Sequence, residues 1–238
     1  MCSGRVDLKF VLKAFFNGSD GVLIGGCRLG ECNYVTQGNF YALNMVKLCK
    51  RILEHVGLNP ERLSINFMSS AEGILFARTV TDFSNKIKEL GPLGEQEGIN
   101  RNELKTRLEE AIKLVPYIKV AEREKLALCY DKNNVEKYDQ LYTKEEIEKL
   151  FADVPSYYID PEKCQACGTC RRRCPADAIT GDKGLVHVID QDKCIKCGTC
   201  FEACPPRFGA VTKIIGEPVP PPLPEDKRKI ERKTKKKA

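Results

Sequence analysis

The apolar positions in the first 92 residues alternate between a helical and a strand-like spacing. A helix is expected over 6–16, where apolar side chains fall near one helical stripe, at Val6, Phe10, Val11 and Phe15. A strand is expected at 22–24, where the chain is continuously apolar, as in a parallel strand that is buried on both faces. The same patterns predict a helix over about 40–55, a strand over 63–68 and a helix from about 69 to 90.

Turn and cap residues separate these elements. Residues 17–21 are typical of a turn, and Gly57 is expected to end the second helix at its C′ position. Ser69-Ser70-Ala71-Glu72 predicts the start of the third helix with an acidic first turn, and Gly91-Pro92 predicts its end. The order of helix, strand, helix, strand and helix predicts an α/β domain over 1–92, with a parallel sheet covered by helices.

Two strands are too few for that architecture, because a two-stranded parallel sheet cannot bury two helical layers. Cys2 lies just before the first helix, where an earlier strand would be expected to end. We therefore expect the sheet to be incomplete in this chain, and to be completed by residues absent from it or by a partner subunit.

The middle of the chain, residues 93–155, is predicted to be a mostly helical connector that offers a docking surface. Apolar residues four positions apart predict a helix that ends at Pro116, with this spacing at Leu104, Leu108 and Ile112. Residues 122–130 predict a second helix. Thr143 and Glu146 match a capping box that opens a third helix, which runs to about residue 151.

Residues 156–215 contain an internal repeat with a period of 30 residues, since the segment from Ile159 to Cys164 recurs from Ile189 to Cys194. Each copy carries the cysteine spacing of bacterial ferredoxins and ends in Cys-Pro. Three cysteines two residues apart let a tight loop wrap one corner of a cuboidal cluster. The fourth is expected to begin a helix and to reach the other cluster. The predicted ligands of the first [4Fe-4S] cluster are Cys164, Cys167, Cys170 and Cys204. Those of the second [4Fe-4S] cluster are Cys194, Cys197, Cys200 and Cys174.

Zinc is the alternative occupant of such cysteines, but zinc sites use pairs of cysteines separated by a dozen or more residues. Gly168 and Gly198 lie where the backbone must approach the inorganic core closely, and Pro175 and Pro205 redirect the chain after the last ligand. The spacing does not fix the reduction potentials. Residues 171–173, all arginine, either raise the potential of a neighbouring cluster or only solvate the surface.

Residues 216–238 follow the repeat and are expected to be disordered, so that their removal leaves the clusters unchanged. Prolines make the first part stiff and extended, at Pro218, Pro220, Pro221, Pro222 and Pro224. The last residues are basic and lack a hydrophobic face. This tail either docks on an acidic partner or an anionic lipid, or is only solvated.

The cysteines outside the repeat suggest one further metal site. Cys27 and Cys32 lie in the loop at the carboxyl end of the 22–24 strand, where open α/β sheets place their ligand sites, and Cys2 is expected beside them. Cys49 and Cys129 are expected to lie in helices and to pack in the core. Structural roles are expected for the only two histidines, His55 and His187.

Composition narrows the class of protein. The chain has 238 residues and 13 cysteines, with neither an apolar run of roughly 20 residues nor a basic-then-apolar start, so we expect a cytoplasmic protein that does not span a membrane. The net charge of +6 lies mostly in residues 225–238, where eight Lys/Arg and three Asp/Glu give +5. Bound clusters would make the rest slightly acidic, which disfavours nucleic-acid binding. No nucleotide-binding motif or catalytic constellation is found.

Several motifs in the first 90 residues resemble those of the delta subunit of methyl-viologen-reducing (F420-non-reducing) hydrogenases. They are Cys2-Ser3-Gly4-Arg5, residues 25–34 from Gly25 to Tyr34, Gly38-Asn39 and Ser70-Ala71-Glu72-Gly73. The resemblance implies an electron-transfer adaptor with a [2Fe-2S] cluster, in which Cys2, Cys27 and Cys32 match family cysteines. The family normally begins with a further strand and a Cys-x-x-Cys-like motif, which this chain lacks. Three cysteines are too few for an all-cysteine site, so the start is truncated, another chain supplies ligands, or the site is empty or altered.

The resemblance also implies the partners. We expect a non-catalytic electron-transfer subunit of an anaerobic oxidoreductase complex, between a hydrogenase, formate dehydrogenase or NADH-oxidising subunit and a flavoprotein similar to heterodisulfide reductase A. Two alternatives remain open at this point: a free ferredoxin-like carrier and a redox-sensing adaptor. A carrier needs no second domain with an incomplete sheet, which favours the complex.

Overall fold

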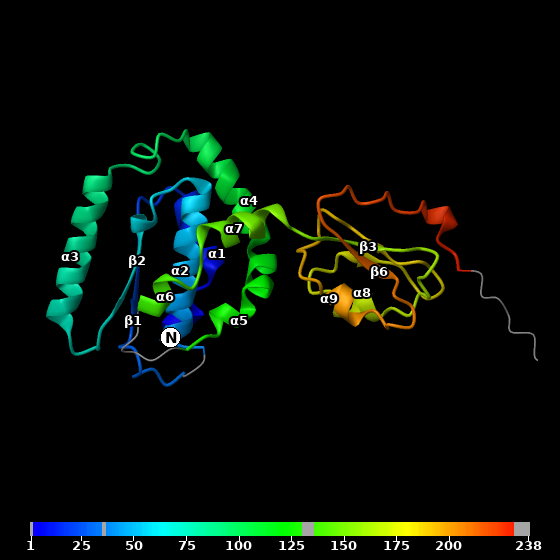
Figure 1. The fold of residues 1–238 in the computed structure, drawn as a ribbon, viewed down its shortest axis with the longest axis horizontal. Coiled ribbons are helices and arrows are strands. Elements are labelled where there is room, and N and C mark those ends of the chain that lie inside the picture. Colours follow the sequence, from blue (N-terminus) through cyan, green and yellow to red (C-terminus); the bar gives the residue numbers. More distant parts are fainter. Residues whose placement is uncertain (1, 35–36, 130–135, 231–238) are drawn as a thin grey trace, which may run out of the picture. The chain divides into compact units, whose positions relative to one another are not determined.

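The computed structural model describes residues 2–34, 37–129 and 136–230, and the chain divides into two compact units, residues 1–151 and 152–238 (Figure 1). The first unit combines helices with a small parallel sheet. The second is built from short antiparallel strand pairs and two short helices. No helix in the described ranges has both the length and the apolar character that crossing a bilayer requires.

The first unit follows the predicted order of helix, strand, helix, strand and helix. Its elements are η1 (Ser3–Arg5), α1 (Leu8–Phe16), β1 (Val22–Gly26), α2 (Asn39–Val56), η2 (Pro60–Arg62), β2 (Leu63–Phe67), α3 (Gly73–Leu90), α4 (Arg101–Ala121), α5 (Arg123–Leu126), α6 (Glu136–Asp139) and α7 (Lys144–Ala152). Strands β1 and β2 pair in parallel, and the sheet has two strands in the described part of the chain. Gly57 ends α2 in the left-handed conformation at φ 94°, as predicted.

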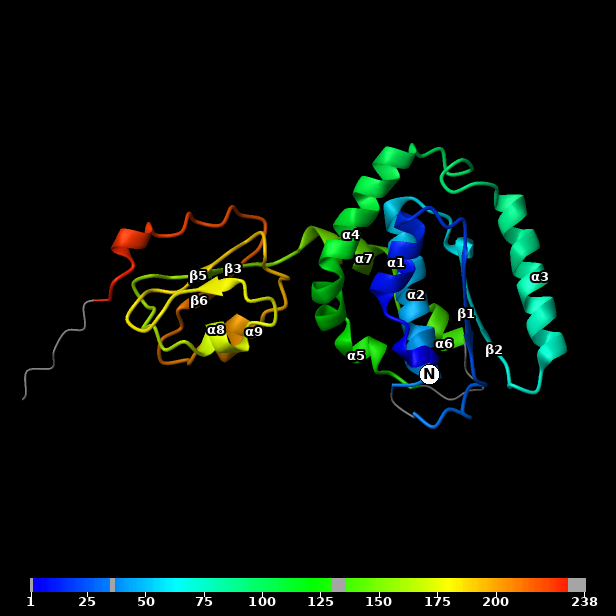
Figure 2. The ribbon, with the colours of Figure 1, turned by 180° about the vertical axis from the view of Figure 1, so that it is seen from behind.

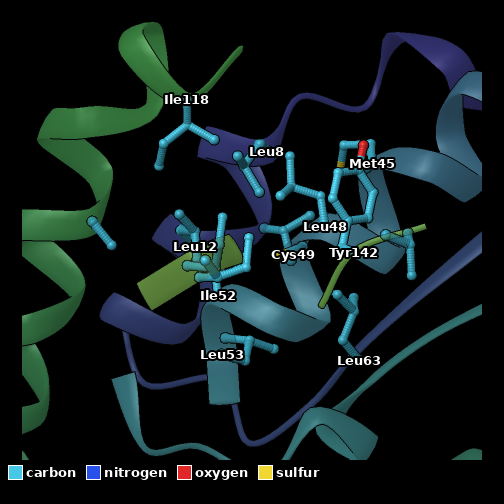
Figure 3. Close-up of a cluster of buried hydrophobic side chains, with 14 of the residues drawn as sticks. Leu8, Leu12, Met45, Leu48, Cys49, Ile52, Leu53, Leu63, Ile118 and Tyr142 are labelled. Carbon is cyan, nitrogen blue, oxygen red and sulfur yellow. The ribbon is translucent and has the colours of Figure 1, made fainter. Parts of the chain in front are cut away.

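Helix α2 forms the centre of the core of the first unit (Figure 3). Its fully buried side chains include Leu48, Cys49, Ile52 and Leu53. Helix α1 packs on it with Leu8, Val11, Leu12 and Phe15. The predicted stripe was wrong for Phe10, which is 65% exposed, because the buried face follows an i, i+3, i+4, i+7 spacing that begins at Leu8.

The helices of the expected connector belong to the same core. Helix α4 packs against α1 and α2, and its buried side chains are Leu104, Leu108, Ala111, Val115 and Ile118. The prediction that this helix ends at Pro116 was wrong. Proline removes one backbone hydrogen bond, but Val115 and Ile118 are buried on either side of it, and their packing keeps the chain helical as far as Ala121.

The predicted capping box is present at the start of α7. The Thr143 hydroxyl accepts a hydrogen bond from the Glu146 amide at 3.2 Å, and the Glu146 carboxylate accepts one from the Thr143 amide at 3.1 Å. Helix α3 differs from the prediction, since it begins at Gly73 and Glu72 is its N-cap.

Helix α3 stands apart from the other helices, on the far side of the two strands (Figures 1 and 2). None of its residues is buried, and its first half exposes Ile74, Leu75, Phe76 and Val80. Its second half approaches the start of β1, where a Cβ on Gly21 would lie 2.5 Å from Ile87. A sheet of two strands therefore leaves α3 without a buried face.

A buried ion pair between Arg62 and Glu97 lies just before β2. Arg62 is fully buried, and its guanidinium donates to Glu97 at 2.6 and 3.1 Å. It also donates to backbone carbonyls before β1 and at the end of α3, at Asp20, Leu90, Gly91 and Pro92. Burial alone would raise the pKa of Glu97, but hydrogen bonds from Arg62 and from the Asn59 amide hold it below its ordinary value.

The second unit is assembled from paired short elements. They are β3 (Ser156–Ile159), α8 (Thr169–Arg173), β4 (Ile179–Thr180), β5 (Val188–Ile189), α9 (Thr199–Ala203), β6 (Val211–Ile214) and η3 (Glu225–Lys227). Strand β3 pairs with β6 and β4 with β5, both antiparallel. A separate core, which includes ferredoxin cysteines, lies between the strands and the two helices.

Residues 218–230 form a strap on the second unit, in contrast to the disorder that we expected there. The Val186 amide donates to the Arg228 carbonyl at 2.8 Å, and the Ile230 amide donates to the Gly184 carbonyl at 2.9 Å. Ile230 packs against the buried core. The backbone bonds come from residues that follow the prolines, so the end of the described chain is paired with residues 184–186. The expectation that removal of 216–238 leaves the clusters unchanged stays a prediction. Residues 231–238 lie outside the described ranges.

The buried ion pair predicts the first measurable effect. We expect Glu97→Ala to lower the free energy of unfolding of the full chain by about 3–5 kcal/mol, because it leaves the Arg62 charge buried and unpaired. The control is Glu61→Ala, which removes an exposed partner of Lys50 and should cost about 1 kcal/mol or less. Urea unfolding followed by far-ultraviolet circular dichroism measures both. Equal losses for the two variants would contradict the role of Arg62.

Candidate functional site

The two cysteine runs of the second unit begin with the same turn. In the first, the Cys164 amide donates to the Asp160 carbonyl at 3.0 Å. In the second, the Cys194 amide donates to the Asp190 carbonyl, also at 3.0 Å. The side chains of both aspartates accept backbone hydrogen bonds two residues further on. The sequence repeat is thus a repeat of structure.

Both runs then adopt a backbone conformation that few L-residues tolerate. Ala166 and Lys196 are left-handed at φ 48° and 56°, although neither is glycine. Gly168 and Gly198, each two residues later, are left-handed at φ 72° and 79°. Strained backbone that recurs at equivalent positions points to a functional demand on these loops, in keeping with the close approach predicted for the glycines.

Short helices follow each loop, α8 after the first and α9 after the second, and they pack side by side (Figure 2). Cys174 and Cys204 follow the last residues of these helices, so the prediction that they begin helices was wrong. The cause is the proline after each cysteine, which disfavours helical backbone in the preceding residue. Both cysteines are extended, at φ near −70°.

The structure brings together the four cysteines that were assigned to the first cluster. One cavity of the second unit is lined by Cys164, Cys167, Cys170 and Cys204. Three of these thiols come from the first run and the last comes from the end of the second run. Sulfur atoms that converge on a single cavity form a donor set that suits a [4Fe-4S] cluster.

The cysteines assigned to the second cluster also lie close to one another. Burial raises the pKa of Cys194, and Cys197 and Cys174 raise it further through their charges. The Ala178 amide donates to the Cys174 sulfur at 3.3 Å. The last thiol of the first run therefore lies near the second run, which mirrors the position of Cys204.

Burial makes the innermost thiols hard to ionise on their own. Desolvation and the neighbouring cysteines raise the pKa of Cys170 to about 11 and that of Cys200 to about 12. A metal that binds such thiols must displace their protons, since the thiolate is the ligand form. These residues fit iron–sulfur clusters better than solvent-exposed redox chemistry.

One side chain outside the cysteine runs, that of His187, contacts the first site. His187 is 2% exposed, and its Nδ1 lies 3.9 Å from the Cys164 sulfur. Burial and the charge of Arg171 lower its pKa. Arg171 itself binds the Gly181 carbonyl and the Asp182 carboxylate, both at 2.6 Å. We expected a structural role for His187. Its contact was missed, although the repeat identifies it as the counterpart of Tyr157.

The first unit gathers Cys2, Cys27 and Cys32 at the carboxyl end of β1. The sulfurs of Cys2 and Cys32 are 3.5 Å apart. Burial, Cys32 and Cys2 together raise the pKa of Cys27. Burial would also raise the pKa of Cys32, but hydrogen bonds from the Tyr34 and Asn39 amides lower it below its ordinary value. The three thiols are one short of an all-cysteine [2Fe-2S] site, and within the described residues they are not placed as a group that could hold a single metal ion.

Asn39, which the sequence analysis did not single out as a contact, ties this loop together. Its side chain is 1% exposed and donates to the carbonyls of Cys27 and Arg28 at 2.9 and 2.7 Å. It also lies 3.6 Å from the Cys27 sulfur. Arg28 in turn pairs with Glu72, which joins the loop after β1 to the segment after β2. Asn39 belongs to Gly38-Asn39, one of the motifs that resemble the hydrogenase delta subunits, and this was the sequence feature that could have indicated its role.

The remaining cysteines and histidine are not among the assigned ligands. Cys49 is fully buried in α2, as predicted, and burial raises its pKa. Cys129 is exposed and lies outside the helices, so the prediction of core packing was wrong, because α5 ends at Leu126. His55 stacks on Phe151 with the ring centroids 4.3 Å apart.

Comparisons with known proteins divide the chain in a similar way. Residues 1–91 match the family model described as methyl-viologen-reducing hydrogenase, delta subunit, and residues 128–208 match a 4Fe-4S dicluster domain. The second match supports [4Fe-4S] clusters, and it begins before the compact unit that starts at residue 152.

Several curated proteins share the first part of the chain. An iron-sulfur subunit of the F420-non-reducing hydrogenase of Archaeoglobus profundus is 45% identical over 91 residues, which is 38% of this chain and 66% of that protein. The corresponding vhu iron-sulfur subunit of the same hydrogenase type, from Methanopyrus kandleri, is 41% identical over 92 residues, 39% of this chain and 69% of that protein.

A third relative is much larger than this chain. It is one of the subunits of the ferredoxin:CoB-CoM heterodisulfide reductase of Methanosarcina mazei, and it is 42% identical over 113 residues, which is 48% of this chain but 14% of that protein. The match to the hydrogenase subunits covers most of their length, whereas the match to the reductase covers a small part. This chain therefore belongs to the methyl-viologen-reducing hydrogenase delta-subunit family, and it joins that domain to a 4Fe-4S dicluster domain.

Proposed function

We propose that this chain is an electron-transfer subunit of an anaerobic oxidoreductase complex. It would relay electrons between a donor module of the hydrogenase, formate dehydrogenase or NADH-oxidising type and a flavoprotein similar to heterodisulfide reductase A. The observation that carries this proposal is the presence, in one chain, of a hydrogenase delta-subunit domain and two four-cysteine sites. The relatives named as heterodisulfide reductase subunits support the choice of flavoprotein.

In this proposal the residues of the second unit hold two [4Fe-4S] clusters, which supply one-electron transfer when bound. Cys164, Cys167, Cys170 and Cys204 would hold one of them. The second would be held by Cys194, Cys197, Cys200 and Cys174. The left-handed loops would let the backbone approach each site, and the buried core would shield Cys164, Cys170 and Cys200 from bulk water.

The first unit would carry the contact with the partner and a further [2Fe-2S] centre. Cys2, Cys27 and Cys32 supply three thiols at one loop, and the fourth ligand would come from a partner. A partner that completed the two-stranded sheet would also cover the exposed apolar side chains of α3. The proposed setting is the cytoplasm.

The relay is tested with the reconstituted complex of donor, flavoprotein and this chain. On addition of H2, formate or NADH without oxygen, we expect the visible absorbance of this chain to bleach during turnover, and flavin reduction to stop when the chain is left out. A chain that stays oxidised while the flavoprotein turns over would support a redox-sensing adaptor. A stable monomer that accepts electrons without the other subunits would support a free carrier.

The crosswise assignment of ligands is tested by pairs of substitutions. We expect Cys174→Ser and Cys194→Ser each to lose about four of eight iron atoms, and the double variant to lose no more, because both residues hold the same cluster. The matched control is Cys174→Ser combined with Cys164→Ser, which should lose both clusters. Iron and sulfide analysis of the anaerobically purified chain measures each. The reverse pattern would mean that each run binds its own cluster.

The [2Fe-2S] centre is tested by counting iron in the native complex. We expect about ten iron atoms on this chain, of which eight belong to the two [4Fe-4S] clusters. Cys27→Ser should reduce the count to eight, whereas Cys129→Ser, which removes an exposed thiol that is not among the assigned ligands, should leave it at ten. A wild-type count of eight would rule out the centre.

A further inference from the structure

The repeat of the second unit allows each residue to be compared with its counterpart 30 positions away. His187 is the counterpart of Tyr157, since each lies two residues before the isoleucine that begins a copy. Both rings lie against the opposite run. The Tyr157 hydroxyl would be 2.8 Å from a Cβ on Gly198, and the His187 Nδ1 is 3.9 Å from the Cys164 sulfur. The first site therefore has the imidazole of His187 at the position where the second site has the phenol of Tyr157.

His187 is held in this position on both sides. It is 2% exposed, and a Cβ on Gly181 would lie 3.0 Å from the His187 Cα, so the backbone closes over the residue. Buried polar groups need a partner, and the Cys164 sulfur is within reach of Nδ1. An iron-bound thiolate has lone pairs and no hydrogen, so the hydrogen of this contact belongs to Nδ1.

The charges beside the two loops also differ. Arg172 in α8 is the counterpart of Glu202 in α9. The Arg172 guanidinium lies beside the first loop, where a Cβ on Gly168 would be 3.0 Å from Nη1. The first site therefore has Arg172 nearby, and the equivalent position of the second half carries an anion. The second loop has a cation of its own, Lys196, but its ammonium is bonded to the Ser156 hydroxyl at 3.1 Å.

We propose that His187 and Arg172 make the two cluster sites unequal, and that they raise the reduction potential of the site formed by Cys164, Cys167, Cys170 and Cys204 above that of the other. This rests on the proposed function, since it requires both clusters. An added electron increases the negative charge on the thiolate sulfurs, and a donated hydrogen bond and a nearby cation both stabilise that charge. The hydrogen stays on Nδ1, so no proton is transferred. An electron that enters the second unit comes to rest at the first site.

The test is a redox titration of the full chain, purified without oxygen and followed by electron paramagnetic resonance. The key variant is His187→Phe, which keeps a buried ring and removes the hydrogen-bond donor. The titration should show two reduction steps. We expect the midpoint potential of one step to fall by about 59 mV, which is a tenfold change in the equilibrium constant of a one-electron reduction, and the potential of the other step to stay unchanged. Two steps that move together, or neither step moving at full iron content, would overturn the proposal.

The step that moves is identified in chains that hold a single cluster. In Cys174→Ser, which should retain only the first cluster, His187→Phe should still lower the remaining potential. In Cys204→Ser, which should retain only the second, His187→Phe should change nothing. A shift in the Cys204→Ser background would place the effect at the wrong site. Iron contents other than four atoms in these backgrounds would instead count against the ligand assignment of the proposed function.

Three further variants separate the hydrogen bond from packing. His187→Gln keeps an N–H donor, so it should restore part of the potential that His187→Phe loses. Arg172→Glu, which copies the charge of Glu202, should lower the reduction potential of the same step without a change in the core. If His187→Phe fails to assemble its cluster, the potential of Arg172→Glu tests the proposal instead. His55→Phe removes the other histidine, in the first unit, and should leave both potentials unchanged. Wild-type potentials in both His187→Phe and Arg172→Glu would refute the proposal.

Discussion

The second unit depends on one constraint, which is that thiols from both copies of its repeat must come together at the same sites. A cavity lined by three cysteines of the first run is completed by the last cysteine of the second, Cys204, and Cys174 lies near the second run in turn. Neither site can form until both halves have packed against each other. The matching turns at Asp160 and Asp190, the left-handed loop residues and the side-by-side packing of α8 and α9 all hold this crosswise arrangement.

The first unit is organised differently, because the residues that stabilise its fold are not the residues that carry the thiols of its candidate site. Helix α2 supplies the largest share of the core, and the Arg62–Glu97 pair fastens the end of α3 to the segment before β1. The three thiols lie at the carboxyl end of β1, in a loop held by Asn39. Helix α3 takes little part in either, since none of its residues is buried. The apolar surface that a larger sheet would cover is left facing outward.

The sequence was sufficient for whatever depends on local spacing. It predicted the order of elements in the first unit, the αL end of α2 at Gly57, the Thr143 capping box and the family. It failed where distant packing overrides local preference. Pro116 lies inside a helix because Val115 and Ile118 are buried beside it, and the segment 218–230 is ordered by bonds to residues 184–186. The contact of His187 with Cys164 was likewise invisible, because it joins residues 23 positions apart.

The strap also brings the basic end of the sequence to the cluster-bearing unit. The Ile230 amide donates to the Gly184 carbonyl of that unit, and the eight residues that follow Ile230 in the sequence carry five Lys/Arg and one Glu. An acidic surface that attracted these lysines would be drawn to the unit that holds the clusters. The strap would thereby link a partner with an acidic surface to the cluster-bearing unit, and such a link raises the local concentration of that partner beside the clusters.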